Sequence, residues 1–258
     1  AWKALKEGAK VVAAGRSFLD DAGFSLHMIC AGRSQAAADA DLDLIQSIMA
    51  ESGGRAVENT IPKILRANPV TGSVQDWDMP MEPGCIAPAA SGGLVVALRD
   101  GIYRAQEWGV GLRLLHRIDH DVLTTGGKAD PLGRFWAGTM YEPRTAALAE
   151  LLVLDCRDGR APSVQRMAGG VTVANGLAWS PDRRRVYWAD TAQHCVWVWD
   201  WDAERNRMGG EREFHRVPSK PAQWQSGMSG YAGRPDGAAV DEQGNYYVAM
   251  FEGQRLHK

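Results

Sequence analysis

Short runs of bulky apolar residues, separated by polar turns, dominate the chain from about residue 62 onward. The clearest stretch is 175–190, which reads Asn-Gly-Leu-Ala-Trp-Ser-Pro-Asp-Arg-Arg-Arg-Val-Tyr-Trp-Ala-Asp. Its apolar segment 177–179 and its aromatic segment 186–189 flank a turn at 180–184 that contains Pro and Asp, residues that turns favour. The pattern predicts a β-hairpin with Asn175 at the entry to its first strand, a place where loops carry chemistry.

Four segments share one pattern, in which a polar turn is followed by two or three bulky β-forming residues and then by an alanine. The alanines are Ala97, Ala137, Ala189 and Ala249, at intervals of 40, 52 and 60 residues. Repeats of about 40–50 residues built from short strands indicate β-propeller blades. We expect the small alanines on an inner strand, where blades crowd around a central channel. A β-sandwich with accidental internal similarity is the alternative.

The first 60 residues follow a different pattern. Segments 1–10 and 34–51 are rich in helix-forming residues, and short apolar runs that suit strands lie between them. We therefore predict an N-terminal segment of mixed α/β character over residues 1–62 and an all-β propeller over residues 63–258.

The length of the β-rich region bears on the number of blades. The residues after Pro62 suffice for about four blades of about 45 residues each. A propeller closes into a ring to hide its sheet edges. Three alternatives follow: the first 60 residues supply strands, the propeller is truncated, or a partner completes it. The end at 254–258 falls where we expect the second strand of a blade, which favours truncation.

Composition and charge narrow the class of protein. With 29 basic and 31 acidic residues among 258, the net charge is −2, which gives no argument for a nucleic-acid partner. The sequence shows no apolar run of membrane-spanning length and no signal-peptide pattern at residues 1–8. Its four cysteines form no CxxC motif and are interpreted as reduced thiols. We expect a cytoplasmic protein with no nucleic-acid or membrane partner.

Three motifs in order, 130–140, 175–182 and 235–241, carry a family resemblance. They read Asp-Pro-Leu-Gly-Arg-Phe-Trp-Ala-Gly-Thr-Met, Asn-Gly-Leu-Ala-Trp-Ser-Pro-Asp and Pro-Asp-Gly-Ala-Ala-Val-Asp. With this spacing, residues 63–258 resemble the regucalcin/gluconolactonase family. The resemblance implies a six-bladed β-propeller, complete or incomplete here. It also implies one divalent cation at the mouth of the channel, Ca²⁺, Mn²⁺, Mg²⁺ or Zn²⁺, and the hydrolysis of a sugar lactone.

The resemblance assigns roles to four residues. Asn175 matches a metal-binding asparagine, and Asp236 matches a metal-binding aspartate that also serves as general base. An amide oxygen and a carboxylate are hard ligands that suit such cations. A bound cation polarises a lactone carbonyl and eases deprotonation of its water, and a carboxylate can take that proton. Thr125 and Lys128 occupy the segment where the family holds its substrate.

The sequence departs from the family at three places. The family's first metal ligand is a glutamate in a Gly-Glu-Gly-Pro motif. In this chain only the pair Glu7-Gly8 matches part of that motif. The family's substrate-holding Arg and Asn are replaced here by Leu123 and Thr125. Leucine cannot donate the two parallel hydrogen bonds with which an arginine would hold a substrate. Third, we expect the last strands of the propeller to be missing from residues 63–258. A cation held by two protein ligands and water binds weakly, because affinity rises with ligand number and charge.

Other conspicuous residues receive structural interpretations. We place His116 and His120 in a polar loop and His194 in a turn. We expect the alternating Trp197, Trp199 and Trp201 to pack between blades.

Two functions from different classes remain open. One is a metal-dependent lactonase acting on a sugar lactone, with Asn175 and Asp236 at the cation. The other is a non-catalytic propeller that binds a cation or a protein partner. The sequence specifies neither the lactone nor the oligomeric state.

Overall fold

The computed structural model describes residues 62–118, 122–157, 161–225 and 228–258. The chain divides into two compact units, Ala1–Asp78 and Met79–Lys258. The predicted mixed α/β character of the N-terminal segment falls on residues 1–61, outside the described residues. The domain boundary at residues 62 and 63 stays a prediction.

The described residues form seventeen strands and contain no α-helix. In the first unit, β1 (Lys63–Ala67) pairs with β2 (Val74–Asp78) in an antiparallel hairpin. The strands of the second unit are β3 (Pro83–Pro88), β4 (Leu94–Leu98), β5 (Gly101–Ala105), β6 (Arg113–Arg117), β7 (Val122–Ala129), β8 (Phe135–Tyr141), β9 (Ala149–Asp155), β10 (Ser163–Val171), β11 (Ala174–Trp179), β12 (Arg185–Asp190), β13 (Cys195–Asp202), β14 (Arg207–Arg216), β15 (Arg234–Val240), β16 (Tyr246–Phe251) and β17 (Arg255–His257). No helix in the described ranges has the length and apolar character needed to cross a membrane.

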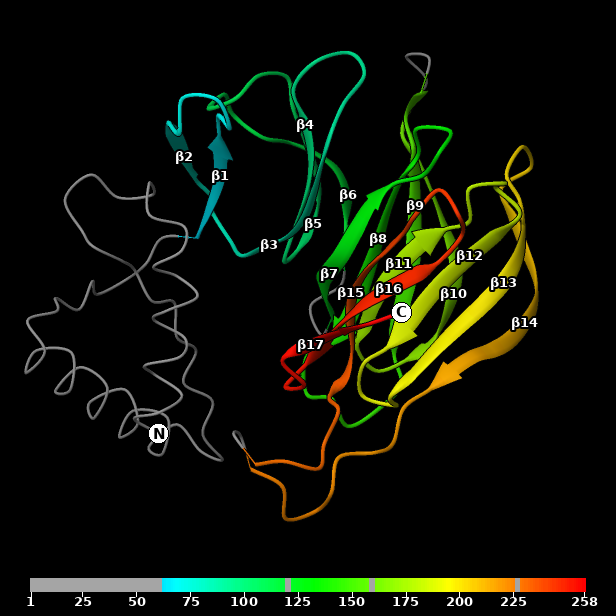
Figure 1. The fold of residues 1–258 in the computed structure, drawn as a ribbon. Helices are drawn as coiled ribbons and strands as arrows, with labels where there is room; N and C mark the ends of the chain where they lie inside the picture. Colours follow the sequence, from blue (N-terminus) through cyan, green and yellow to red (C-terminus); the bar gives the residue numbers. More distant parts are fainter. Residues whose placement is uncertain (1–61, 119–121, 158–160, 226–227) are drawn as a thin grey trace, which may run out of the picture. The chain divides into compact units, whose positions relative to one another are not determined.

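The second unit consists of four antiparallel sheets whose strands follow chain order (Figure 1). Three sheets have four strands, β3–β6, β7–β10 and β11–β14, and one has three, β15–β17. The first strand of each sheet packs beside the first strand of the next, so that β3, β7, β11 and β15 form an inner row. This is the arrangement of propeller blades around a channel. The all-β prediction is confirmed, whereas the count of six blades stays a prediction.

The predicted repeat corresponds to the first hairpin of each sheet. The prediction was wrong about the alanines, because Ala97, Ala137, Ala189 and Ala249 lie on the second strands and not on the innermost ones. The polar turn precedes each alanine, and the inner strand precedes that turn. Ala97, Ala137 and Ala189 are fully buried, so the small side chain fits the crowded second layer between neighbouring blades.

The chain end also differs from the prediction. Residues 255–257 form β17, the third strand of the last sheet, where a second strand was expected. The inner strand of that sheet, β15, contains a Pro-Asp-Gly sequence that is more typical of a turn than of a strand.

Tryptophans of neighbouring sheets pack together in the core. Trp136 of β8 lies 5.5 Å from Trp179 and 6.0 Å from Trp201, measured between ring centroids, in edge-to-face arrangements. Trp199 and Trp201 are buried, and Trp197 packs against the same cluster. The prediction that the alternating tryptophans pack between blades is therefore confirmed.

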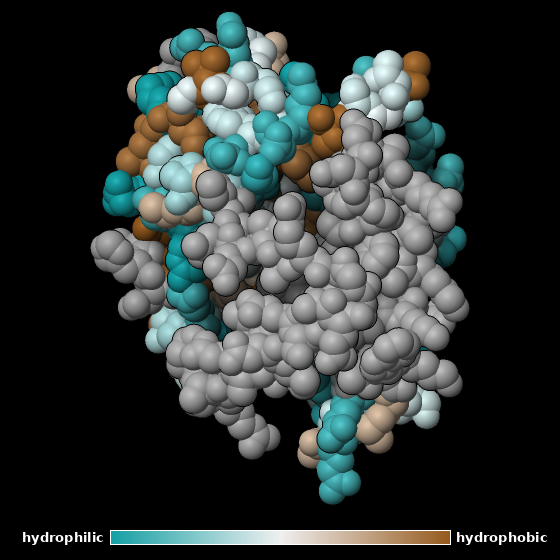
Figure 2. All heavy atoms as spheres, turned by 90° about the vertical axis from the view of Figure 1, so that its left-hand side faces the viewer, coloured by the Kyte–Doolittle hydropathy of each residue, from teal (hydrophilic) through white to brown (hydrophobic). Residues whose placement is uncertain are grey.

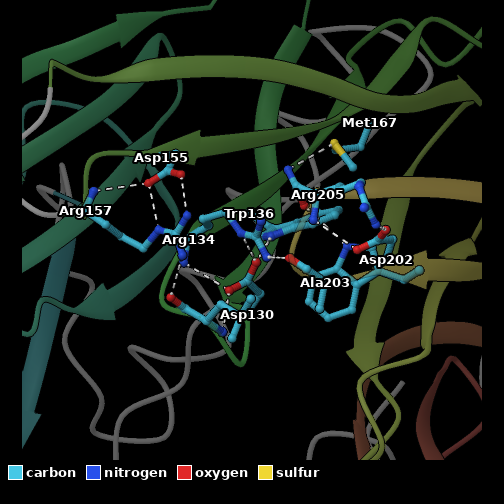
Figure 3. A network of polar contacts seen from close by, with 12 residues as sticks. Asp130, Arg134, Trp136, Asp155, Arg157, Met167, Asp202, Ala203 and Arg205 are labelled. Atoms are coloured by element: carbon cyan, nitrogen blue, oxygen red, sulfur yellow. Dashed lines mark hydrogen bonds and ion pairs between the residues drawn. The ribbon is translucent and has the colours of Figure 1, made fainter.

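The motif 130–140 forms a buried polar network at the β7–β8 turn (Figure 3). The carboxylate of Asp130 accepts hydrogen bonds from the Arg134 backbone and Nε and from Trp136 Nε1. Arg134 Nη2 donates to the carbonyl of Ala203, in the β13–β14 turn of the next sheet, at 2.7 Å. The guanidinium of Arg134 also lies 5.5 Å from the Trp201 ring centroid. This motif therefore joins two blades.

The described surface mixes polar and apolar residues. On the face drawn in Figure 2, hydrophilic and hydrophobic residues of the described part are interspersed. The large exposed apolar side chains come from separate elements, for example Leu65, Ile86, Leu148, Phe214 and Leu256. Single residues of this kind are usual on protein surfaces.

Candidate functional site

Each of the four inner strands contains a β-bulge. The register against the second strand shifts between Pro83 and Cys85 in β3 and between Thr124 and Gly127 in β7. It shifts at corresponding places after Asn175 in β11 and after Pro235 in β15. A bulge leaves an extra residue unpaired and re-aims the neighbouring side chains. Three of the predicted site residues, Thr125, Asn175 and Asp236, lie at or inside these bulges.

The amide of Asn175 has a defined orientation. Its Nδ2 donates a hydrogen bond to Thr191 Oγ1 at 3.0 Å. Its Oδ1 lies on the side of β7, where a Cβ placed on Gly126 would be 3.3 Å away. No described residue donates a hydrogen bond to this oxygen. The amide oxygen of Asn175 therefore has no donor among the described residues. Gly126, which has no side chain, leaves space in front of this oxygen.

Thr191 connects the two strands that carry the predicted metal ligands. Its hydroxyl accepts from Asn175 on β11 and donates to the carbonyl of Pro235 on β15 at 2.7 Å. Thr191 is buried, and its backbone N–H donates to the carbonyl of Val173 at 3.0 Å. The residue before Asp236 is thus fixed to Asn175 through one hydroxyl group.

Asp190 fixes the backbone next to both Asn175 and Thr191. Its fully buried carboxylate accepts hydrogen bonds from the N–H groups of Thr172 and Val173, just before β11. It also accepts from the N–H groups of Ala192 and Gln193, in the turn after β12. A carboxylate that receives several backbone donors fixes both segments, because each donor would be costly to leave unpaired.

Asp236 is a half-buried acid on the neighbouring inner strand. Burial raises the pKa of its carboxyl above the usual value, while the Gly237 N–H and the charge of Arg234 act in the opposite direction. A Cβ placed on Gly176 would lie 3.1 Å from the backbone carbonyl oxygen of Asp236, so β11 and β15 approach closely at this level.

The close approach of β11 and β15 requires a glycine at position 176. Its φ is +59°, and a Cβ there would lie 2.5 Å from the hydroxyl of Tyr246. That hydroxyl donates to the Gly176 carbonyl at 2.7 Å, and burial raises the pKa of the phenol. Tyr246 is the first residue of β16, so a second blade fixes the backbone next to Asn175.

Thr125 and Lys128 lie on β7, and both side chains are bound to other inner strands. Thr125 Oγ1 donates to the carbonyl of Ala174 on β11 at 2.7 Å. Lys128 Nζ donates to the carbonyl of Ala238 on β15 at 2.8 Å, and burial lowers the pKa of this amine. Two of the three ammonium donors remain without a protein partner in the described part of the chain.

The donors present agree in chemistry with a hard divalent cation, but they are few. An unpartnered amide oxygen and a half-buried carboxylate on adjacent strands are ligand types that Ca²⁺, Mg²⁺ and Mn²⁺ prefer. Within the described ranges, no group of three or more His, Cys, Asp or Glu residues is placed to hold a metal ion. Backbone carbonyls, water or a further ligand would have to complete the coordination.

The sequence interpretation missed Asp190, Thr191 and Tyr246. Asp190 was placed as the end of a hairpin strand, and its burial beside polar backbone could not be inferred from the hairpin pattern. The available signal was the polar pair Asp-Thr directly after a fully apolar strand. His194 lies in a turn with a φ of +58°, as predicted. His116 lies on β6 instead of in a loop, and His120 is outside the described residues.

Blades around a channel, with oxygen donors at the bulges of adjacent inner strands, define a β-propeller with a candidate cation site. Residues 57–258 match the family model described as SMP-30/Gluconolactonase/LRE-like region. The chain belongs to this family, as the sequence motifs predicted.

Three similar proteins illustrate the match. A 6-deoxy-6-sulfogluconolactonase of Pseudomonas putida is 40% identical over 200 residues, covering 75% of this chain and 62% of that protein. Regucalcin of Gallus gallus is 27% identical over 208 residues, covering 78% of this chain and 64% of that protein. A solved structure of a luciferin-regenerating enzyme has a TM-score of 0.62 and 26% identity, covering 78% of this chain and 66% of the other. The chain thus spans less than two thirds of the length of these relatives.

Proposed function

We propose that this protein hydrolyses a sugar lactone with the help of one divalent cation. The observation that carries the proposal is the fixed amide oxygen of Asn175, which lies on the side of Gly126, on the strand next to the half-buried Asp236. Membership of the SMP-30/Gluconolactonase/LRE-like family and a relative named as a sulfogluconolactonase support it.

Asn175 and Asp236 would hold the cation, and the cation would polarise the lactone carbonyl and acidify a bound water. Asp236 then acts as general base for the attacking water. Its position suits this role, because a partly buried carboxyl is more basic than an exposed one.

Lys128 and Thr125 are proposed to contact the substrate from β7. Lys128 carries a positive charge that has no ion-pair partner among the described residues, and it has two donors to spare. Thr125 retains the acceptor capacity of its hydroxyl oxygen, because its proton is used on Ala174. Replacement of Lys128 by Met should raise KM more than it lowers kcat, because the amine binds substrate and takes no part in proton transfer.

The name of the Pseudomonas putida relative suggests a class of substrate to test. A sulfonated gluconolactone carries a permanent negative charge, which glucono-1,5-lactone lacks. Both lactones should therefore be compared as substrates, with Mn²⁺, Ca²⁺, Mg²⁺ and Zn²⁺ each added to protein that has been treated with EDTA.

The decisive experiment follows acid release from these lactones in a pH-stat. We expect cation-dependent hydrolysis that falls at least about a hundredfold in Asp236→Ala, because both a metal ligand and the base are lost. Asp182→Ala is the matched control, since Asp182 is an exposed turn residue on the neighbouring sheet. Hydrolysis that is unaffected by EDTA and by Asp236→Ala would overturn the proposal. Cation binding without hydrolysis would favour a non-catalytic, cation-binding propeller instead.

A further inference from the structure

Thr191 lies at the centre of a chain of hydrogen bonds. For each of these bonds the donor and the acceptor can be identified. The carbonyl of Pro235 can only accept, so Thr191 Oγ1 must donate its single proton to it over 2.7 Å. The hydroxyl oxygen is then left with lone pairs alone, and its neighbour at 3.0 Å must be a donor.

The direction of these hydrogen bonds decides which end of the Asn175 amide lies on the side of Gly126. Only the NH₂ group can donate to Thr191, so Oδ1 is directed away from Thr191, on the side of Gly126. If the amide turned over, its oxygen would face the lone pairs of Thr191 Oγ1, and the NH₂ group would lie on the side of Gly126. An NH₂ group cannot be a ligand to a cation.

The position of Thr191 is itself fixed. Asp190, directly before it, is fully buried and accepts four backbone hydrogen bonds, two from the segment before β11 and two from the turn after β12. The Thr191 backbone N–H is bound to Val173. The backbone of Thr191 is therefore fixed against the segment before β11, and its hydroxyl is held between Asn175 and Pro235.

We infer that Thr191 is a positioning residue that keeps the Asn175 amide oxygen turned toward the cation. The inference rests on the proposed function of Asn175 and Asp236 as cation ligands. It adds a residue that touches neither cation nor substrate and acts through the orientation of one amide. Groups that orient metal ligands commonly affect metal affinity by 10- to 100-fold when removed.

The first test measures Mn²⁺ binding by titration calorimetry on the purified protein after EDTA treatment. Thr191→Val has nearly the same shape but can neither accept nor donate, and its dissociation constant should rise about tenfold or more. Thr191→Ser keeps the hydroxyl, so its dissociation constant should stay within about twofold of the wild-type value. Equal binding by wild type and Thr191→Val would overturn the inference.

A double-mutant cycle separates orientation from general damage to the fold. In Asn175→Asp both terminal atoms are oxygens, so the direction of the side chain no longer matters. The effect of Thr191→Val on Mn²⁺ affinity should therefore shrink to about twofold in the Asn175→Asp background. An undiminished loss in that background would mean that Thr191 is only a structural support, which contradicts the inference.

A cation-free measurement keeps the inference testable if the proposed function fails. The side-chain NH₂ of Asn175, observed by NMR in ¹⁵N-labelled protein with EDTA, should exchange slowly with solvent in wild type and Thr191→Ser. It should exchange at least about tenfold faster in Thr191→Val, because the hydrogen bond is lost. Fast exchange in the wild type would contradict the hydrogen bond from Asn175 to Thr191 and would overturn the inference. Absence of Mn²⁺ binding in the wild type, with slow exchange, would overturn the proposed cation site and leave the fixed amide established.

Discussion

Gly176 illustrates how closely single residues are constrained around the channel. It combines a φ of +59° with the nearby Tyr246 hydroxyl and Ala189 side chain. Neither the backbone angle nor the space tolerates a Cβ. The Asn-Gly pair at 175–176 is therefore not a hairpin turn but the start of a bulge within β11.

Gly176→Ala should lower the free energy of unfolding by about 1–3 kcal/mol, through left-handed backbone strain and steric contact with Tyr246. Chemical denaturation of EDTA-treated protein measures the loss. Gly209→Ala on β14 is the control, because a Cβ there meets no atom within 4 Å. Equal stability of the two variants would show that the strand adapts more easily than its contacts indicate.

His194 predicts a pH dependence of stability. Its Nε2 accepts from the Tyr231 hydroxyl at 2.7 Å, and its Nδ1–H donates to the Ala192 carbonyl at 3.2 Å. Burial lowers the pKa of this imidazole below its usual 6.5, with Arg234 acting in the same direction and Glu252 and Asp190 against it. Because the folded pKa is depressed, stability is complete above about pH 6.5 and decreases as the pH falls below it.

His194→Asn should make the melting temperature less sensitive to acidification between about pH 7 and pH 5. Asparagine tolerates the left-handed backbone at this position, where φ is +58°. Thermal unfolding of both proteins at several pH values tests this expectation. Identical slopes for wild type and variant would exclude His194 as the source of the acid sensitivity.

At the scale of elements, connections between blades come from buried polar groups as well as from apolar packing. Arg134 reaches the β13–β14 turn, Lys128 reaches β15, and Thr191 joins β12 to both β11 and β15. The Asp130–Arg134 pair is the most buried of the ion pairs found among the described residues, with side-chain exposures of 0% and 2%.

Asp130→Ala should lower the free energy of unfolding by about 3–5 kcal/mol, because it leaves the buried Arg134 guanidinium without its counter-charge. Asp182→Ala, at the corresponding turn of the next sheet but exposed, should cost less than about 1 kcal/mol. Urea denaturation of both variants measures the difference. A loss for Asp130→Ala no larger than that for Asp182→Ala would mean that solvent reaches Arg134 in the variant.

The sequence was sufficient to predict elements that a local pattern encodes. The turn-strand-alanine repeat located the hairpins of the second unit, because turn residues and period-two alternation are local signals. Strand β15 carries no such local signal, because its Pro-Asp-Gly sequence is typical of a turn and a bulge at Asp236 and Gly237 interrupts its alternation. Placement of the alanines was wrong for a related reason, since an irregular inner strand left the second strand as the first regular one.

The site was predictable only through its motifs. Asn175 and Asp236 were identified from the resemblance, and the structure places them on adjacent inner strands. The role of Thr191 depends on contacts to residues 16 and 44 positions away in the chain, which no local pattern encodes. The same holds for Lys128, whose hydrogen bond to Ala238 spans 110 positions.

At the scale of the whole molecule, the proposed cation, held by residues of two blades, would couple binding to folding. A ligand that binds only the native state stabilises it by about 2.7 kcal/mol at a hundred times its dissociation constant. The melting temperature of the protein should therefore rise with added Mn²⁺ or Ca²⁺, and Asp236→Asn should abolish the rise. Differential scanning calorimetry with and without EDTA measures both. A rise that persists in Asp236→Asn would place the cation elsewhere.

The bulges in the four inner strands have a consequence for how such a ring can diversify. A bulge re-aims the side chains beside it, so the residues at these four places occupy corresponding positions in their sheets. The residue directly after the register shift begins is Gly84 in β3, Thr125 in β7, Gly176 in β11 and Asp236 in β15. A Cβ on Gly84 would lie 2.6 Å from the Thr124 backbone oxygen, and one on Gly176 would lie 2.5 Å from the Tyr246 hydroxyl. Diversification by side-chain exchange is therefore open at the bulges of β7 and β15 and closed at those of β3 and β11.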